Sequence, residues 1–225
     1  MASPVTANLK ICYSGSMYMN LKEIFTHIYR KNLWESDETA SGLESTLEQT
    51  EVLIHLLPKL FSILGVQRLL DVPCGDFYWM QYVDLEQVHY HGGDVVTELI
   101  EQNQTRYAGP GISFSELDLT RSDLPEADLI LIRDCFAFLS HVQVWRCLKN
   151  LMRHEFKYVL ISTHDDISIN NPSQTGLWRP LNLQRDPFSL PAPGKLFPEA
   201  AADKSLGLWS YEQLQTWAQE KGLLR

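Results

Sequence analysis

The sequence is short of cysteines, of long apolar runs and of basic residues, and each shortage excludes a class of protein. Its four cysteines, Cys12, Cys74, Cys135 and Cys147, show no CxxC spacing and no paired framework, which indicates reduced thiols rather than a disulfide scaffold. No apolar run approaches the ~18 residues that a membrane span needs. The first residues also lack the basic start and apolar stretch of a secretory signal. We therefore expect a cytoplasmic protein with no membrane partner.

Acidic residues outnumber basic ones, which bears on the ligands that the chain can bind. The 225 residues include 19 Lys plus Arg against 28 Asp plus Glu, a formal net charge of −9. Such a chain lacks the basic footprint of a nucleic-acid binder, so we expect no nucleic-acid partner and instead a small or cationic ligand. The cysteines and histidines are not clustered at metal-ligand spacing, so we expect no metal site.

Short apolar segments alternate with amphipathic segments through the centre of the chain. Apolar runs that end in acids or small residues predict strands, and apolar residues at i, i+3, i+4 spacing predict helices. The expected strands are 68–72, 88–92, 112–117, 128–132 and 158–162, and the expected helices are 20–31, 46–60, 95–107, 139–153 and 211–221. This β–α alternation predicts a parallel sheet with helices on both faces.

The carboxyl-terminal part departs from that alternation. Residues 165–193 contain five prolines and no period, which is typical of a long functional excursion rather than of a helix. Two short strands follow at 195–198 and 205–209, and the small polar link between them predicts a hairpin. The predicted fold class is therefore α/β, a Rossmann-like doubly wound seven-stranded sheet with an antiparallel closing hairpin. We expect residues 1–45 to form an amino-terminal helix and lid over the ligand, and residues 46–225 to form the core.

Acids follow the ends of several expected strands, at the edge where open α/β sheets bind ligands. Asp71 ends the first strand and leads through Pro73 and Gly75 to an expected helix start, where glycine lets a ligand approach the backbone. Asp94 lies 19 residues beyond Gly75, close to the spacing at which an acid holds ribose hydroxyls. Two further acids end the next strands, Asp118 and Asp134. The alternative for each acid is a helix cap or a turn residue, and for the glycine turn a simple strand–helix connection.

Together with two longer blocks, these acids resemble the class I S-adenosylmethionine-dependent methyltransferases. The blocks are DVPCGDFYWM, residues 71–80, and WRPLNL, residues 178–183, and the finer pattern resembles a small-molecule group of that superfamily. The resemblance implies S-adenosylmethionine as the cofactor, with Asp94 at its ribose and Asp118 and Leu119 at its adenine. The residues expected at the cofactor are Tyr29, Trp34, Ser41, Asp71, Pro73, Gly75, Asp94, Asp118, Leu119 and Arg133.

The chain differs from that group at two places near the expected reaction centre. After the fourth strand the group reads Arg-Asp-x-Leu-x-His-Leu-Ser, whereas this chain has Phe136 and Phe138. The fifth strand of the group often ends in Thr-Thr-Phe, and here it ends in Ser162-Thr-His164. The cofactor assignment is unaffected, but an acid–base role is not carried over to residue 138.

Methyl transfer from a sulfonium needs mainly alignment and desolvation, and it needs a base only when the acceptor must lose a proton early. Asp134 and His164, expected at the ends of central strands, are the candidate catalytic residues. The alternatives are a structural histidine, and an aspartate that caps a helix or pairs with Arg133. The residues expected on the substrate side are Phe138, Trp178 and Arg179. Arg179 could hold a carboxylate bidentately or could anchor its own loop.

The sequence therefore predicts an enzyme, a methyltransferase that acts on an oxygen or nitrogen of a small-molecule acceptor, with a carboxylate acceptor left open. The alternatives are a non-catalytic nucleotide-binding or scaffold domain of the same fold, and a methyltransferase of protein side chains. A nicotinamide-dependent dehydrogenase is disfavoured because residues 73–76 lack the full G-x-G-x-x-G pattern.

Overall fold

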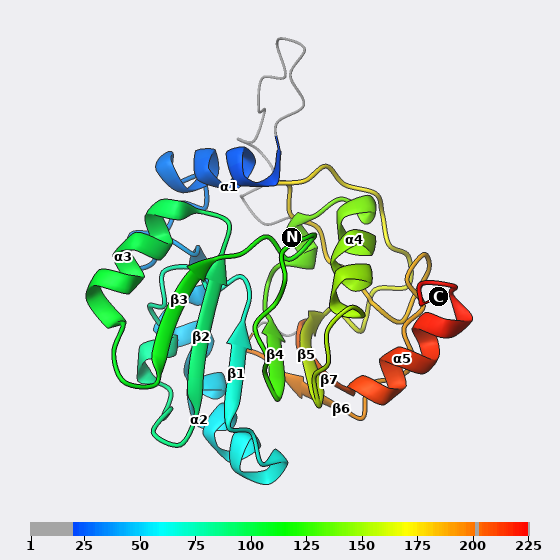
Figure 1. Cartoon of the computed structure of the whole chain (residues 1–225). Helices are drawn as coiled ribbons and strands as arrows, with labels where there is room; N and C mark the ends of the chain where they lie inside the picture. Colours follow the sequence, from blue (N-terminus) through cyan, green and yellow to red (C-terminus); the bar gives the residue numbers. More distant parts are fainter. Residues whose placement is uncertain (1–19, 201–202, 225) are drawn as a thin grey trace.

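A seven-stranded mixed sheet forms the centre of the molecule (Figure 1). The computed structural model describes residues 20–200 and 203–224. The strand order is β3-β2-β1-β4-β5-β7-β6, parallel from β3 to β5 and antiparallel at β7 and β6. The strands are β1 (Arg68–Asp71), β2 (His89–Asp94), β3 (Ile112–Glu116), β4 (Leu129–Ile132), β5 (Tyr158–Thr163), β6 (Lys195–Pro198) and β7 (Ser205–Ser210). The predicted doubly wound sheet and its closing hairpin are confirmed.

Helices and short 3₁₀ turns connect these strands. The α-helices are α1 (Leu21–Arg30), α2 (Leu47–Leu64), α3 (Thr97–Tyr107), α4 (His141–Leu151) and α5 (Tyr211–Glu220), and the 3₁₀ turns are η2 (Leu43–Ser45), η3 (Met80–Tyr82) and η4 (Phe136–Phe138). Among the described residues, no helix has the length and apolar character needed to cross a membrane. As predicted, residues 165–193 contain no helix, so β5 reaches the hairpin through an irregular segment.

Side-chain caps set several of the helix starts. Asn20 accepts a hydrogen bond from the Glu23 backbone N–H, and the Glu23 carboxylate accepts one from the Asn20 N–H, a capping box that begins α1. The Ser140 and Ser210 hydroxyls cap α4 and α5. At the other end, α2 stops at Gly65, whose φ of 63° is left-handed and suits glycine.

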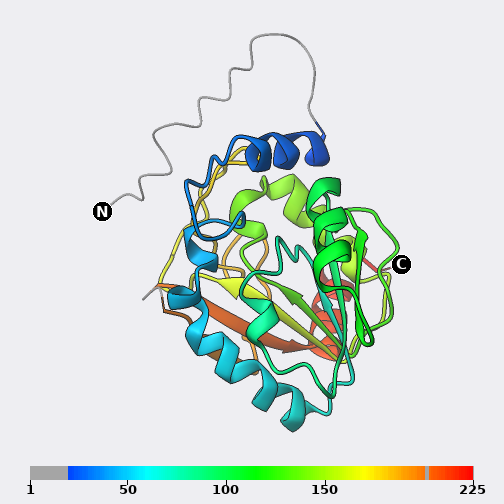
Figure 2. The ribbon, with the colours of Figure 1, turned by 90° about the vertical axis from the view of Figure 1, so that its left-hand side faces the viewer.

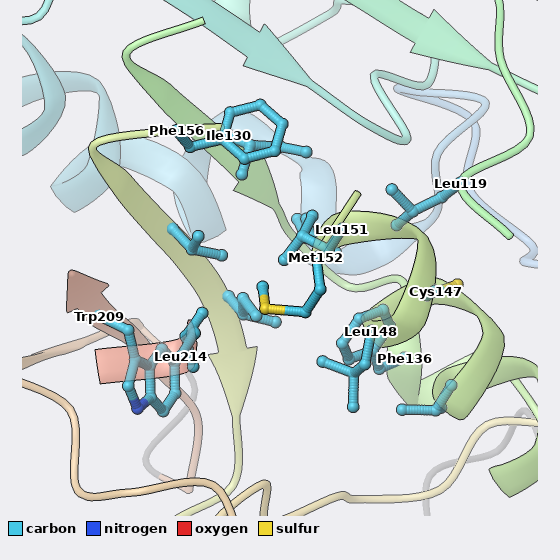
Figure 3. Close-up of a cluster of buried hydrophobic side chains, with 14 of the residues drawn as sticks. Leu119, Ile130, Phe136, Cys147, Leu148, Leu151, Met152, Phe156, Trp209 and Leu214 are labelled. Carbon is cyan, nitrogen blue, oxygen red and sulfur yellow. The ribbon is translucent and has the colours of Figure 1, made fainter. Parts of the chain in front are cut away.

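Two buried apolar clusters cover the two faces of the sheet. Neighbouring residues on a strand point to opposite faces, so Leu69 and Leu129 join one cluster while Leu70 and Ile130 join the other. Helices α4 and α5 contribute to the second cluster, and Figure 3 shows part of it, including Leu148 and Leu151 of α4 and Leu214 of α5. Helix α2 supplies the first. Helix α1 lies at the top of Figures 1 and 2, next to the start of α3, and its Leu21 and Phe25 pack both on the second cluster and on a third, smaller one of Val95, Val96 and Leu99.

One expected element is absent from the described part of the chain. The turn after β1 was expected to open a helix behind Gly75, and this prediction is wrong because only the short η3 turn follows. Phe77 adopts a left-handed φ of 59°, which a helix cannot contain. Its ring is buried and contacts Tyr90 and Phe114, with ring centroids 5.0 and 5.2 Å away. Burial of this aromatic ring therefore replaces helix formation at the turn.

A carboxylate clips together the strand starts at the opposite edge of the sheet. Asp128 Oδ2 accepts hydrogen bonds from the backbone N–H groups of Gln67 and Arg68, both at 2.9 Å, and Oδ1 pairs with Lys157 Nζ at 3.0 Å. Burial raises the pKa of Asp128, but these donors outweigh it, so the pKa lies below its ordinary value.

We predict that Asp128→Ala lowers the free energy of unfolding at pH 7 by about 2–4 kcal/mol, because it removes two charge-assisted hydrogen bonds and an ion pair. The stabilisation belongs to the ionised carboxylate, so the loss should shrink as the pH falls below about 4. Urea unfolding at several pH values measures both effects, with Asp123→Ala, at an exposed side chain, as the control. Equal stability of the two variants at pH 7 would contradict the prediction.

Candidate active site

A cavity lies at the carboxyl ends of β1, β2 and β4, under α1 and under the loop that follows it, residues 31–45, which we call the covering loop. The space between its lining atoms, open solvent at its mouth included, is about 1020 Å³. The predicted site residues that line it are Tyr29, Trp34, Ser41, Asp71, Pro73, Gly75, Asp94, Leu119, Arg133, Asp134 and Phe138. Lining residues that were not predicted include Phe25, Trp79, Val95, Val96, Leu99 and Leu139.

Two buried acids form one polar side of this cavity. Asp71 accepts a hydrogen bond from the Tyr90 hydroxyl at 2.8 Å. Asp94 accepts hydrogen bonds from the backbone N–H groups of Gly75 at 3.2 Å and Val96 at 2.9 Å. Burial raises the pKa of Asp71 to about 7 and that of Asp94 to about 6, since neither has a cationic side chain as a direct partner. Both sites would therefore favour a cation over an anion.

Asp76, in the turn that follows β1, holds the covering loop over the cavity. Its oxygens accept hydrogen bonds from the Thr39 hydroxyl at 2.8 Å, the Ala40 N–H at 2.7 Å and the Ser41 hydroxyl at 2.9 Å. Gly75 has a left-handed φ of 55°, and a Cβ there would lie 2.0 Å from Ser41 Oγ. Glycine is therefore needed at this position for the covering loop to approach, whereas we expected it to be needed for the approach of a ligand. Asp76 was not among the predicted site residues.

Aromatic side chains form the opposite wall. Trp34 lies between Phe25 and Phe138, with ring centroids 6.3 and 5.5 Å away. Its indole N–H is buried without a hydrogen-bond partner among the described residues. Trp79 also faces the cavity and carries the Arg133 guanidinium 5.5 Å above its ring. These faces come from α1, the covering loop, η4 and the turn before η3, so segments distant in the sequence build one apolar wall.

A buried ionic cluster closes the far end of the cavity. Arg133 donates two hydrogen bonds to Glu199 Oε2, at 2.9 and 2.7 Å, and Arg133 Nη1 lies 3.0 Å from Asp134 Oδ2. Lys204 Nζ lies 3.0 Å from both Asp134 Oδ2 and Glu44 Oε2. We call these five residues the ionic cluster. It ties the β6–β7 hairpin and the covering loop to the end of β4.

Asp134 is the carboxylate of the ionic cluster that lines the cavity, beside Arg133. Its φ of 49° is left-handed, which is uncommon for aspartate and marks a position held by its surroundings. Burial raises the pKa of Asp134, but the attraction of Arg133 and Lys204 outweighs it and holds the pKa below its ordinary value. The carboxylate therefore stays ionised at neutral pH and is a weak base.

Four of the predicted site residues do not line the cavity: His164, Trp178, Arg179 and Asp118. His164 is buried, and its Nδ1 accepts a hydrogen bond from the Leu181 N–H at 3.1 Å, while its ring lies 5.8 Å from that of Trp178. Arg179 donates to the backbone carbonyls of Asn171, Phe136, Ala137 and Leu139. This is the loop-anchoring alternative for Arg179.

Asp118, the fourth of these residues, caps its own turn. Its carboxylate accepts hydrogen bonds from the Thr120 N–H at 2.9 Å and from the Thr120 hydroxyl at 2.6 Å. The neighbouring Leu119 and Thr120 line the cavity in its place. No group of His, Cys, Asp and Glu side chains within the described residues has the arrangement of a metal site.

We predict that Asp76→Ala frees the covering loop. Loss of three hydrogen bonds to residues 39–41 should raise amide hydrogen exchange there by about 10- to 100-fold. The matched control is Asp84→Ala, because the Asp84 carboxylate caps only an exposed turn through the Glu86 N–H. Exchange at residues 39–41 that is the same in both variants would show that Asp76 does not hold the loop.

No family model matches this sequence, and no curated protein matches it. Among solved structures, human N-acetylserotonin methyltransferase in complex with SAM matches 85% of this chain at 13% identity, with a TM-score of 0.60. Mitomycin 7-O-methyltransferase MmcR matches 83% at 14% identity and a TM-score of 0.60, and the pyocyanin biosynthetic protein PhzM matches 81% at 14% identity and 0.59. The matches span only 60%, 60% and 61% of those chains. The protein therefore has the Rossmann-like fold of these methyltransferases.

Proposed function

We propose that this protein transfers a methyl group from S-adenosylmethionine to an oxygen or nitrogen of a small molecule. The observation that carries the proposal is the cavity itself, which places buried acids and an aromatic wall at the carboxyl ends of the central strands. The structures of similar fold include an enzyme solved with SAM and two named for small-molecule methylation or biosynthesis. A cavity under a covering loop fits a reaction that needs alignment and exclusion of water.

The residues present fit the cofactor at several points. Asp94 uses one hydrogen bond on each oxygen and keeps acceptor capacity for ribose hydroxyls. Asp71, buried without a cationic side chain as a direct partner, suits the ammonium of the methionine end. Leu119 would contact the adenine, and Asp118 leaves the proposed set because its carboxylate is used in its own turn. Tyr29, Trp34, Ser41, Pro73, Gly75 and Arg133 remain in the proposed set as lining residues.

The sulfonium of the bound cofactor supplies an electrophilic methyl carbon, so the protein's own part is to hold the acceptor in line with it and to keep water out. Phe138 and Trp34 would contact the body of the acceptor from the aromatic wall. Asp134 is the polar group at this wall that could orient the accepting atom. His164 and Arg179 would act as internal supports, since their polar atoms bind the backbone.

We predict that S-adenosylhomocysteine binds in calorimetry and that Asp94→Asn weakens binding by about 10- to 100-fold, because a charged hydrogen-bond acceptor is lost. Asp118→Asn is the matched control, since this carboxylate does not line the cavity, and its affinity should stay within about threefold of the wild type. Absence of binding at millimolar ligand would overturn the proposed function. Binding without turnover on any acceptor would favour the non-catalytic nucleotide-binding alternative.

We also predict that affinity for S-adenosylhomocysteine falls as the pH is lowered from 8 to 5. Ionised Asp71 and Asp94 attract the ligand's ammonium and accept its hydroxyls, and their pKa values of about 7 and 6 mean that both become protonated in this range. Binding should correspondingly release protons near pH 7. Asp71→Asn should flatten the upper part of the profile. A wild-type affinity independent of pH between 8 and 5 would contradict the assignment of both acids.

A further inference from the structure

We infer that the methyl acceptor is an amine nitrogen of a small apolar or aromatic molecule, held at the carboxylate of Asp134 between the ionic cluster and the aromatic wall. This inference rests on the proposed methyl transfer and deepens it by naming the class of substrate. Three features of the cavity support it: its cations are already paired, it lacks a suitable base for the acceptor, and negative charge exceeds positive charge beside the acceptor position.

The cationic groups near the cavity are already paired. Arg133 is the sole cationic side chain among the described residues that line it, and its guanidinium is bound by Glu199 and Asp134. Lys204 forms ion pairs with Asp134 and Glu44, and Arg179 donates hydrogen bonds to backbone carbonyls. A carboxylate acceptor would therefore meet Asp134 without a cation to balance it, and like charges in a buried site repel strongly.

A hydroxyl acceptor lacks a base on this wall. A hydroxyl must lose its proton early in the transfer, which needs a group whose pKa lies near the working pH. Asp134 is held ionised by two cations, so it accepts hydrogen bonds without retaining a proton. His164 is buried behind the wall, with Nδ1 already accepting from Leu181. Asp71 and Asp94, whose pKa values are raised, belong to the proposed cofactor side of the cavity.

A neutral amine needs neither a cationic anchor nor a base during the transfer, and an amine that arrives as its ammonium ion has no lone pair and first gives a proton to water. The lone pair of the neutral nitrogen forms the N–CH₃ bond while the C–S bond breaks, and its electron pair leaves with sulfur as a thioether. The nitrogen keeps its hydrogens and becomes positively charged, and a proton then passes to water. A fixed anion beside that nitrogen stabilises the charge as it develops.

The ionic cluster supplies such a fixed anion. Its three carboxylates, Glu44, Asp134 and Glu199, face two cations, Arg133 and Lys204, so the formal sum is one negative charge. Glu199 is 7% exposed, and its Oε1 has no hydrogen-bond partner among the described residues. The side chain of Asp134 is 18% exposed and is the carboxylate of the cluster that lines the cavity, next to the less exposed Arg133. The rings of Trp34 and Phe138 add faces that attract a cation.

The test compares acceptors that share one carbon frame. The full chain is incubated with labelled S-adenosylmethionine and separately with phenethylamine, 2-phenylethanol, 4-ethylphenol and 3-phenylpropanoate, and then with further sets built in the same way on larger aromatic frames. We expect methylated product from amines, with kcat/KM at least 100-fold above the matched alcohol, phenol and acid. Preferred methylation of an alcohol, phenol or acid overturns the inference and leaves the proposed function standing. Binding of S-adenosylhomocysteine without methylation of any amine also overturns the inference, and if no other acceptor is methylated either, the non-catalytic nucleotide-binding alternative is favoured.

Two variants separate the role of Asp134 from a general loss of charge. Asp134→Asn should lower kcat/KM for the amine by roughly 10- to 100-fold while S-adenosylhomocysteine affinity changes by less than about threefold. Asp123→Asn makes the same charge change at a side chain that is 90% exposed and does not line the cavity, and it should leave the rate unchanged. Equal rates in both variants overturn the inference. If Asp134→Asn does not fold, the comparison of acceptors on the wild-type protein decides alone. Failure of cofactor binding in the wild type would instead remove the proposed function.

Discussion

The gathering of buried carboxylates at one edge of a parallel sheet is the constraint on which the rest of this structure depends. Asp71, Asp94 and Asp134 stand at the carboxyl ends of β1, β2 and β4, and parallel strands bring these ends to the same edge. Each charge is compensated differently: a tyrosine hydroxyl for Asp71, backbone N–H groups for Asp94, and two cations for Asp134. The pairing of Asp134 with Arg133 and Lys204 also connects the β6–β7 hairpin and the covering loop to the end of β4, so charge compensation helps to fix the tertiary arrangement.

The neutral partners of Asp71 and Asp94 compensate their charges only in part, and this lowers the stability of the fold. The pKa values of Asp71 and Asp94 are raised in the folded state, so their contribution to stability is present below pH about 4 and is lost as the pH rises through 6 to 7. At neutral pH Asp94 is therefore mostly ionised and Asp71 partly ionised, and the ionisation of each lowers the stability of the fold. A cationic ligand in the cavity would offset that loss, which is a physical reason for a site that takes a sulfonium and an ammonium together.

Local features of the sequence were sufficient to predict the sheet and the two acids and the glycine turn that line one side of the cavity. Asp71, Gly75 and Asp94 could be placed because an acid at a strand end and a glycine turn are set by a few adjacent residues. The ionic cluster could not be placed, because Arg133 and Glu199 are 66 residues apart and no periodicity links them. Asp118 was misleading for the opposite reason: the nearby Thr120 and Ser122 already mark a self-capped turn. Phe77 could not be anticipated, since its backbone follows from a buried ring rather than from helix propensity.

The attachments of the amino-terminal segment differ in strength, and this decides which part can open. Residues 39–45 are fixed at both ends of the cavity, through Asp76 on one side and through Glu44 and the ionic cluster on the other. Helix α1 forms no buried ion pair in the described part of the chain: it is held by burial of Ile24 and Ile28 and by the surface ion pairs Lys22–Glu116 and Arg30–Glu98, each of which contributes only about 0–1 kcal/mol. The inner face of α1 contributes Leu21, Phe25 and Tyr29 to the cavity wall. Part of that apolar face gains contacts only when a ligand fills the cavity. Movement of α1 therefore leaves the buried charges in place, at the cost of exposing Ile24 and Ile28, whereas movement of residues 39–45 would expose the ionic cluster.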